Sequence, residues 1–318
     1  MRGGIVRVRG DEGGVAGMSG TSVGGVVVAL GNFDGVHLGH ALVVGRAVEE
    51  GRRREGRSVA VTFDPHPRAV LRPERKTKLL TVPEVREELL LGRGVDEVRT
   101  IRFDRELSQK GPWEFVRDVL VGEHGAGAVV VGKNFRFGYR ASGNFEDLRR
   151  YMRELGGEAY AVSIYASGAD VSSTRIRDLL AAGDAREAAK LLGRAYLLRG
   201  EVVEGDKRGR SIGFPTANIL PDSRALVPGR GVYAGYVISG DERYGACTNV
   251  GVAPTFDRRE SKVEAHLLDF EGDLYGEVVD VTFEECLRSE MRFDGVGELE
   301  EQIARDVEAA RRLVGGGA

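Results

Sequence analysis

The sequence predicts two folded domains, an N-terminal α/β domain with a doubly wound parallel sheet and a C-terminal antiparallel β domain. In the first half, short Val-rich runs alternate with segments of helical periodicity, as expected when a parallel sheet is covered by helices on both faces. After about residue 193, short strands follow one another between Gly, Pro and Asp clusters. A chain of 318 residues is long enough for two domains of ordinary size.

The N-terminal elements follow from these patterns in chain order. We expect strands over residues 26–30, 58–63, 95–103 and 128–132. We expect helices over residues 40–53, 82–94 and 113–121. Two short helices then follow: Ser172 or Ser173 can cap residues 174–182, and Asp184 can cap residues 185–192. Gly183 and Gly193 end them.

The C-terminal elements have a different rhythm. We expect strands over residues 196–205, 231–239, 244–252, 262–270 and 277–283. This pattern is typical of an antiparallel sandwich or a small barrel, and of the two we predict the barrel. A final helix covers residues 298–314, with an apolar stripe that we interpret as core packing: Leu299, Ile303, Val307, Ala310 and Val314.

Charge and composition exclude several classes of protein. The net charge is -3, from 46 basic and 49 acidic residues, so no bulk attraction draws the chain to nucleic acid or to an anionic membrane. The apolar runs are too short to span a bilayer. We therefore predict no nucleic-acid or membrane partner. Separately, we expect small-molecule substrates and a monomer or weak homo-oligomer.

The cysteines and the N-terminus bear on the compartment. The two cysteines, Cys247 and Cys286, form neither a disulfide framework nor a zinc-ligand spacing, which favours a reducing, cytoplasmic location. Residues 1–25 are glycine-rich and lack the apolar run of a signal peptide. We interpret them as a disordered leader, with Met18 as an alternative to Met1 for the start of translation.

The first candidate site is the turn GNFDGVHLGH, residues 31–40, between the first strand and the first helix. Ligands of doubly wound folds bind at such turns, where glycines and a helix N-terminus accept phosphate. His37 and His40 lie three residues apart and share one helical face, so both imidazoles can stabilise charge on a polyphosphate. A glycine-rich turn with incidental histidines is less favoured, because two of only five histidines lie in it.

This turn resembles the HxGH nucleotidyltransferases, and its variant G-x-F-D-G-x-H-x-G-H looks like bacterial FAD synthetase. Three further motifs look like those of the family in the expected order: FDPHP at 63–67, GKNFRFG at 132–138 and VSSTRIR at 171–177. The resemblance implies that FMN attacks the α-phosphorus of ATP and that pyrophosphate leaves. His37 and His40 would act on the phosphates, and Asp64 and Asn134 would line the FMN pocket. The residues that would bind ATP and its phosphates are Gly31, Phe33, Asp34, Gly35, Ser173, Thr174 and Arg177.

The second candidate site is the glycine-rich basic loop GDKRGR, residues 205–210, followed by GFPTAN at 213–218. Glycines and basic residues suit a phosphate cradle, although the GK[ST] of a Walker loop is missing. Thr216 and Asn218 alternate on an extended segment, so their oxygens can face one Mg²⁺ ion. On spacing alone, a charged hairpin followed by a Pro turn is slightly favoured.

The second half resembles riboflavin kinase, through GDKRGR with GFPTAN, NVG at 249–251, VEAH at 263–266 and RSEMRF at 288–293. The resemblance implies ATP-dependent phosphorylation of riboflavin to FMN, with Glu264 as the base and Mg²⁺ at Thr216 and Asn218. Glu264 and His266 share one face of a strand whose alternate residues face the core; His266 stays unassigned. ATP would bind Gly205, Lys207, Gly209, Arg210, Gly213 and Pro215, and Arg292 and Phe293 would line the flavin site.

The sequence thus predicts a bifunctional Mg-ATP enzyme of the bacterial riboflavin kinase/FAD synthetase family. Residues 26–188 would form the adenylyltransferase domain and residues 189–318 the kinase domain. Three alternatives remain: one module is degenerate, the chain is another HxGH nucleotidyltransferase, or it is a non-catalytic flavin- or RNA-binding protein. Intact motifs in both halves argue against the first, and the PTAN module against the second. A pure carrier would not need His37, His40 and Glu264.

Overall fold

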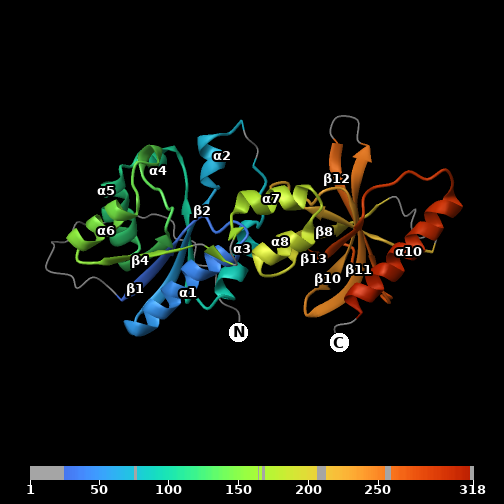
Figure 1. The fold of residues 1–318 in the computed structure, drawn as a ribbon, viewed down its shortest axis with the longest axis horizontal. Coiled ribbons are helices and arrows are strands. Elements are labelled where there is room, and N and C mark those ends of the chain that lie inside the picture. The colour runs from blue at the N-terminus through green and yellow to red at the C-terminus, as the bar shows by residue number, and fades with distance from the viewer. Residues whose placement is uncertain are drawn as a thin grey trace.

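The computed structural model describes residues 25–74, 77–163, 165–166, 169–205, 213–254 and 259–315. The leader predicted over residues 1–25 lies, except for Gly25, outside the described residues. Two domains lie end to end, with α7 (Ser173–Ala181) and α8 (Ala185–Leu192) between the N-terminal sheet and the C-terminal barrel (Figure 1).

The N-terminal sheet has five parallel strands in the order β3–β2–β1–β4–β5. Their bounds are β1 Val26–Leu30, β2 Arg57–Asp64, β3 Glu97–Arg102, β4 Ala126–Gly132 and β5 Glu158–Val162. The central strands are continuous apolar runs because both of their faces are covered. Since β1 lies between β2 and β4, the strand order reverses beside β1, which is where such sheets bind ligands.

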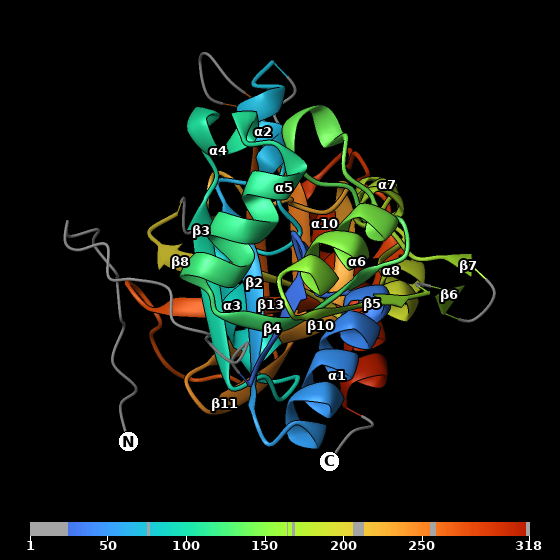
Figure 2. The ribbon, with the colours of Figure 1, turned by 90° about the vertical axis from the view of Figure 1, so that its left-hand side faces the viewer.

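Helices cover both faces of this sheet (Figure 2). On one face, α1 (Leu38–Arg53) packs against β1, β2 and β4, and α3 (Pro83–Leu91) packs against β3. On the other face lie α5 (Pro112–Glu114), its π-helical continuation η1 (Phe115–Glu123), and α6 (Phe145–Glu154). Smaller elements complete the domain: α2 Pro67–Leu71, α4 Arg105–Gln109, the 3₁₀ turn η2 Tyr139–Ala141, β6 Tyr165–Ala166 and β7 Ala169–Asp170. The predicted doubly wound fold is confirmed.

The C-terminal sheet is antiparallel, in the order β11–β12–β9–β8–β13–β10–β14. An additional pairing of β10 with β11 closes it into a barrel, so the predicted barrel is confirmed and the sandwich is excluded. The strand bounds are β8 Tyr196–Val203, β9 Ala217–Pro221, β10 Gly231–Ser239, β11 Glu242–Pro254, β12 Arg259–Leu267, β13 Val278–Phe283 and β14 Glu285–Arg288.

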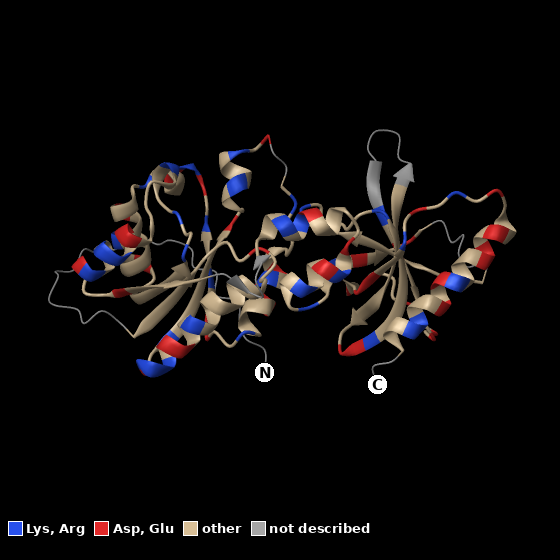
Figure 3. Ribbon diagram, viewed as in Figure 1, with Lys and Arg blue, Asp and Glu red and all other residues tan. Residues whose placement is uncertain are grey.

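The final helix, α10 (Val296–Val314), packs outside the barrel against β10 and β11. Ala310 and Val314 are buried there with Val232 and Ala234. Charged residues of both signs share the exposed helices α1, α6 and α10 (Figure 3), and many form i,i+3 or i,i+4 ion pairs. Across the described residues, none of the helices combines the length and apolar character needed to cross a membrane.

The two domains are connected through α7, α8 and direct contacts. Ser172 caps α7 and Asp184 caps α8, each by accepting a backbone N–H, as two of the predicted caps require. Ile176 and Leu180 of α7 belong to one hydrophobic core with barrel residues and with Leu80 of the N-terminal domain. Arg199 on β8 donates to both carboxylate oxygens of Glu88 on α3, at 2.7 and 2.8 Å.

Candidate active sites

The N-terminal candidate site is built on the turn that joins β1 to α1. His37 caps α1: its Nδ1 accepts a hydrogen bond from the His40 backbone N–H at 3.3 Å. Gly35 has φ of +90°, and a Cβ there would lie 2.8 Å from Leu80 Cδ1, so both conformation and space favour glycine. The Gly35 N–H donates to Thr81 Oγ1 at 3.0 Å, which fixes the turn.

His37 and His40 stack, with ring centroids 3.6 Å apart and planes 14° from parallel. Burial lowers the pKa of His37 to about 4, and burial together with the His37 ring lowers the pKa of His40 well below its usual value. Both imidazoles are therefore neutral at pH 7. Because His37 Nδ1 accepts a hydrogen bond, its proton lies on Nε2, which can donate to a phosphate oxygen.

Asp34 links the turn to two other segments. It is 1% exposed; one carboxylate oxygen accepts from the backbone N–H groups of Leu80 and Thr81 at 2.8 and 3.0 Å. The other oxygen forms an ion pair with Arg177 on α7. The Ser173 hydroxyl donates to the Asp34 carbonyl at 2.8 Å. The structure thus brings the 31–40 and 171–177 motifs together, with the Asp34 carboxylate bound to protein groups.

The remaining predicted ATP-binding residues lie around this turn. Gly31 directly follows β1, and Thr174 is exposed in the first turn of α7. Phe33 is fully buried, with its ring edge-on to His40 at 5.3 Å between centroids. Gly31 and Thr174 can thus face a ligand, whereas Phe33 supports the His40 ring from the protein interior.

Two arginines beside the turn carry no signal in the sequence. Arg86 on α3 is 1% exposed and donates to the carbonyls of Phe63 and Asn32, at 3.2 and 3.4 Å, at the carboxyl ends of β2 and β1. Arg194 donates to the Gly35 carbonyl at 2.9 Å, while its Nε and Nη1 are buried without a hydrogen-bond partner among the described residues. Burial lowers the pKa of Arg194 to about 10, so it stays charged at pH 7.

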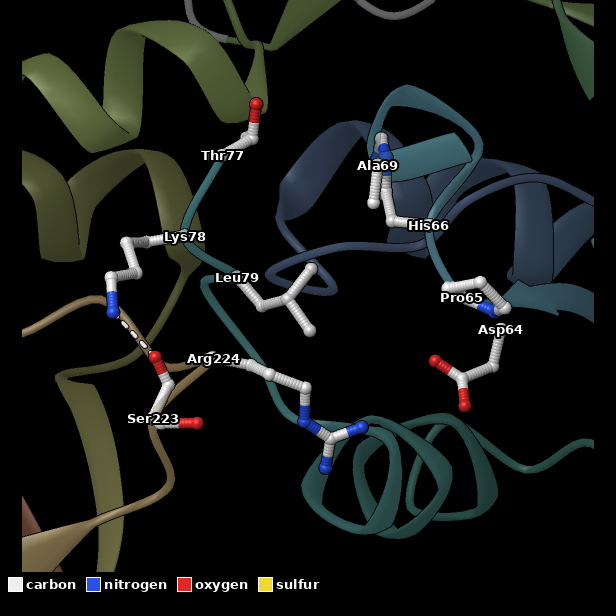
Figure 4. A pocket seen from close by; sticks show the side chains of 9 residues that line it. All are labelled: Asp64, Pro65, His66, Ala69, Thr77, Lys78, Leu79, Ser223 and Arg224. Atoms are coloured by element: carbon white, nitrogen blue, oxygen red, sulfur yellow. Dashed lines mark hydrogen bonds between the residues drawn. The ribbon is translucent and has the colours of Figure 1, made fainter. Parts of the chain in front are cut away.

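The predicted FMN-pocket residues lie on the loops that follow β2 and β4, the strands on either side of β1, and only Asp64 is among the lining residues of the cavity. Asp64 ends β2 and lines a cavity of about 280 Å³ between the two domains (Figure 4). His66 lines the same cavity, and burial lowers its pKa to about 4. Asn134 is exposed in the turn that follows β4. Both loops therefore leave the carboxyl edge of the sheet, where the ligand is expected.

The C-terminal candidate site is a cavity of about 350 Å³ beside β12. Val263, Ala265 and Leu267 are buried in the barrel, whereas the alternate residues Lys262, Glu264 and His266 line this cavity, as the predicted strand alternation requires. Glu264 lies opposite Asn218 on β9 and Asn249 on β11. Its carboxylate is 3.0 Å from the Lys262 ammonium.

The predicted metal ligands lie beside Glu264. Thr216 lines the cavity. Asn218 is 8% exposed, and its Oδ1 is buried without a hydrogen-bond partner among the described residues. An orphaned amide oxygen and a hydroxyl two residues apart in the chain fit Mg²⁺, which takes neutral oxygens together with substrate phosphates. The described residues contain no cluster of three His, Cys, Asp or Glu side chains that could hold a metal instead.

The phosphate loop is described in part. Lys207, Gly209 and Arg210 lie outside the described residues. A Cβ on Gly205 would lie 2.1 Å from Asn218 Nδ2, so a glycine leaves room for that side chain. His266, which the sequence left unassigned, has its Nδ1 2.8 Å from the Pro215 carbonyl and thus fixes the stretch after Gly213 against β12.

The far wall of this cavity comes from β14 and α10. Phe293 lines it, whereas the exposed Arg292 is not among its lining residues. The interpretation of the α10 stripe as pure core packing was wrong in part: Leu299, Ile303 and Val307 line the cavity. The C-terminal part of the stripe packs against β10 and β11, where Val307 also contacts the cluster of Ala310 and Val314.

Two family models match the two halves of the chain. The family model for FAD synthetase matches residues 21–175, and that for riboflavin kinase matches residues 192–314. A bifunctional riboflavin kinase/FMN adenylyltransferase from Escherichia coli (strain K12) is 37% identical over 295 residues, covering 92% of this chain and 93% of that protein. The protein of that name from Bacillus subtilis (strain 168) is 33% identical over 290 residues, covering 90% and 92%.

A solved structure shares the fold over almost the whole chain. It is described as a macrolide-efflux protein from Streptococcus pneumoniae. It superposes with a TM-score of 0.84 at 34% identity, covering 92% of this chain and 95% of that one. The arrangement of both domains is thus shared with an experimentally determined structure.

Proposed function

We propose a role for each site residue from the premise that this chain belongs to the bifunctional riboflavin kinase/FMN adenylyltransferase family. Its C-terminal domain phosphorylates riboflavin to FMN with ATP. Its N-terminal domain transfers the adenylyl group of ATP to FMN, which forms FAD and releases pyrophosphate. The stacked, neutral histidines and the Glu264 face of β12 are the observations on which the assignment of roles depends.

In the N-terminal domain, we propose that His37 and His40 donate ring N–H groups to the phosphates of ATP as negative charge develops on the leaving pyrophosphate. Arg86 and Arg194 add positive charge behind the turn. Asp34 positions Arg177 and Ser173, while Thr174 and the α7 N-terminus face the phosphates. The FMN phosphate is already ionised at neutral pH, so in-line attack on the α-phosphorus needs no protein base.

In the C-terminal domain, we propose that Glu264 takes the proton of the riboflavin hydroxyl as its oxygen attacks the γ-phosphorus of ATP. Lys262 holds the Glu264 carboxylate in place at 3.0 Å. Thr216 and Asn218 would hold Mg²⁺, which would supply charge neutralisation at the ATP phosphates. Phe293 and the apolar residues of α10 would pack against the flavin ring. Lys207, Gly209 and Arg210 remain predictions for the phosphate loop.

The setting of the enzyme is also a proposal. Cys247 and Cys286 are both free thiols, which agrees with a reducing cytoplasm. We propose that the enzyme works there as a monomer or weak homo-oligomer, and size-exclusion chromatography over a hundredfold range of protein concentration tests the oligomeric state.

Separate assays of the two half-reactions test the roles. With FMN and Mg-ATP, His37→Asn should lower kcat for FAD formation by about 10²–10³-fold, while His124→Asn, at the C-terminal end of η1 and outside this turn, keeps wild-type rates. With riboflavin and Mg-ATP, Glu264→Gln should lower kcat for FMN formation by about 10²–10⁴-fold, while Glu201→Gln on β8 does not. Near-wild-type rates for either site variant would contradict its assigned role.

A further inference from the structure

The cavity beside Asp64 is built by both domains. One wall comes from the N-terminal domain, where Asp64 ends β2 and Pro65, His66 and Ala69 follow it. Part of the opposite wall is Ser223–Arg224, from the segment of the kinase domain between β9 and β10. Figure 4 shows the Arg224 side chain extending into the cavity toward the Asp64 carboxylate. A residue of the kinase domain therefore borders the predicted FMN pocket of the adenylyltransferase.

Backbone hydrogen bonds fix this part of the kinase domain in place. The Leu79 N–H donates to the Arg224 carbonyl at 2.8 Å, and the Leu226 N–H donates to the Leu79 carbonyl at 2.8 Å. These bonds form a short parallel bridge between Leu79 and Ala225. Arg224 is thus held against the N-terminal domain by main-chain contacts that do not depend on its side chain.

The same wall adjoins the phosphate-binding turn. Arg177 Nε donates to the Lys78 carbonyl at 2.8 Å, while its terminal nitrogen pairs with Asp34. One arginine therefore connects the cavity wall to the β1–α1 turn. A substrate that fills the cavity can extend its phosphate toward the site where ATP is expected.

The polar groups that face the cavity form a complementary pair. The Asp222 carboxylate accepts hydrogen bonds from Nε and Nη2 of Arg224 at 2.7–3.2 Å. Nη1 of Arg224 lies outside that ion pair. Asp64 presents a carboxylate across the cavity. Pro65, Ala69 and Leu79 supply apolar surface between them. Such a cavity suits a flat ring whose edge carries both carbonyl acceptors and an N–H donor.

We propose that Arg224, a residue of the kinase domain, binds the flavin ring of FMN in the adenylyltransferase reaction. It donates to a carbonyl of the pyrimidine edge of the ring, and Asp64 accepts the ring N3–H. The kinase domain then completes the FMN site of its neighbour. This inference rests on the proposed function, since it takes FMN as the substrate of the N-terminal domain.

Steady-state kinetics of the full-length enzyme test this assignment. Arg224→Ala should raise the KM for FMN about tenfold or more at saturating ATP, because a hydrogen bond from a charged donor is lost. The KM for ATP and the rate of riboflavin phosphorylation in the same preparation should stay at wild-type values. Arg224→Lys should restore part of the loss, and Arg312→Ala, an exposed arginine of α10, serves as the control.

An analogue tests the contact with Asp64. 3-Methyl-FMN lacks the N3–H, so the wild-type enzyme should use it with a KM at least several-fold above that for FMN. Equal use of the two flavins would overturn the proposed contact at the pyrimidine edge.

Other outcomes separate this inference from the proposed function. If Arg224→Ala has the same KM for FMN as the wild-type enzyme, the inference is overturned. The proposed function stays intact in that case, because the wild-type enzyme still makes FAD. A rise in the KM for ATP, or an equal loss of kinase activity, would show that Arg224 only supports the domain contact, which also overturns it. A wild-type enzyme that makes no FAD would instead reject the proposed function.

Discussion

The buried histidines beside the N-terminal site make stability depend on pH. Burial lowers the pKa of His37 and of His66 to about 4, whereas an unfolded histidine titrates near 6.5. Between these values the unfolded chain binds protons that the folded chain does not. The free energy of unfolding should therefore be highest above pH 6.5. It should decrease as the pH falls toward 4, by up to ~1.4 kcal/mol per pH unit for each histidine.

Urea unfolding at pH 7.5, 6.5 and 5.5 measures this effect. The single tryptophan, Trp113, lies in the N-terminal domain and reports its unfolding by fluorescence. His66→Asn is an informative variant, because asparagine can also cap α2 but does not titrate. Its stability should depend less steeply on pH. A wild-type stability that is constant from pH 7.5 to 5.5 would contradict the assigned protonation states.

Single side chains also show how far sequence reasoning extends. Motif and spacing place His37, Asp34 and Arg177 near one ligand, and the structure brings them together. The motif and its spacing do not show that the Asp34 carboxylate is held by Leu80, Thr81 and Arg177. Arg86 was missed because its contacts are with carbonyls at the ends of two strands, at residues 54 and 23 positions away in the sequence. Long-range contacts of that kind leave no periodic pattern in the chain.

Among the elements, the junction of β8 and β9 leaves the space that the side chain of Asn218, the proposed metal ligand, occupies. Gly205→Ala would place a Cβ 2.1 Å from Asn218 Nδ2 and force that side chain to move. We expect the KM for Mg-ATP in the kinase reaction to rise about tenfold, equivalent to ~1.4 kcal/mol, with FAD synthesis from FMN unchanged. The matched control is Gly297→Ala, where a Cβ would meet no atom within 4 Å. An unchanged KM for Mg-ATP in Gly205→Ala would argue against Asn218 as a ligand.

The junction of β14 and α10 depends on a buried ion pair. Asp306 is 5% exposed and accepts hydrogen bonds from Arg288 Nε at 2.9 and 3.0 Å. Asp306→Ala leaves the Arg288 charge without its partner, so it should destabilise the C-terminal domain by about 3–5 kcal/mol in urea unfolding followed by circular dichroism. Glu308→Ala removes an exposed pair on the same helix and should cost less than ~1 kcal/mol. Equal effects would refute this account of the helix contact.

The predicted elements agree with the structure where periodicity was strong and fail where it was weak. No element was predicted over residues 139–170, yet α6 and β5 lie there. The signal for α6 was present: Asn144 caps it, Asp147 completes a capping box, and Leu148 and Met152 are its buried residues. β5 is an edge strand whose residues are exposed or half-buried, so it lacks the continuous Val run of the central strands. The π-helical winding of η1 has no sequence pattern that would distinguish it from an α-helix.

Across the whole molecule, the two domains act in the reverse of their order along the chain. The C-terminal domain makes FMN, and the N-terminal domain consumes it. The two share a hydrophobic core through α7 and α8 and a bidentate contact between Arg199 and Glu88. Their boundary is therefore a packed interface, which was not predictable from the separate patterns of the two halves.

The most direct test of two independent sites in one chain is a time course that starts from riboflavin and Mg-ATP, with riboflavin, FMN and FAD separated chromatographically. Wild type should form FMN and then FAD. His37→Ala should accumulate FMN, whereas Glu264→Ala should leave riboflavin unreacted yet convert added FMN to FAD. If Glu264→Ala also fails with added FMN, or if wild type never forms FAD, the assignment of two separate catalytic sites is contradicted.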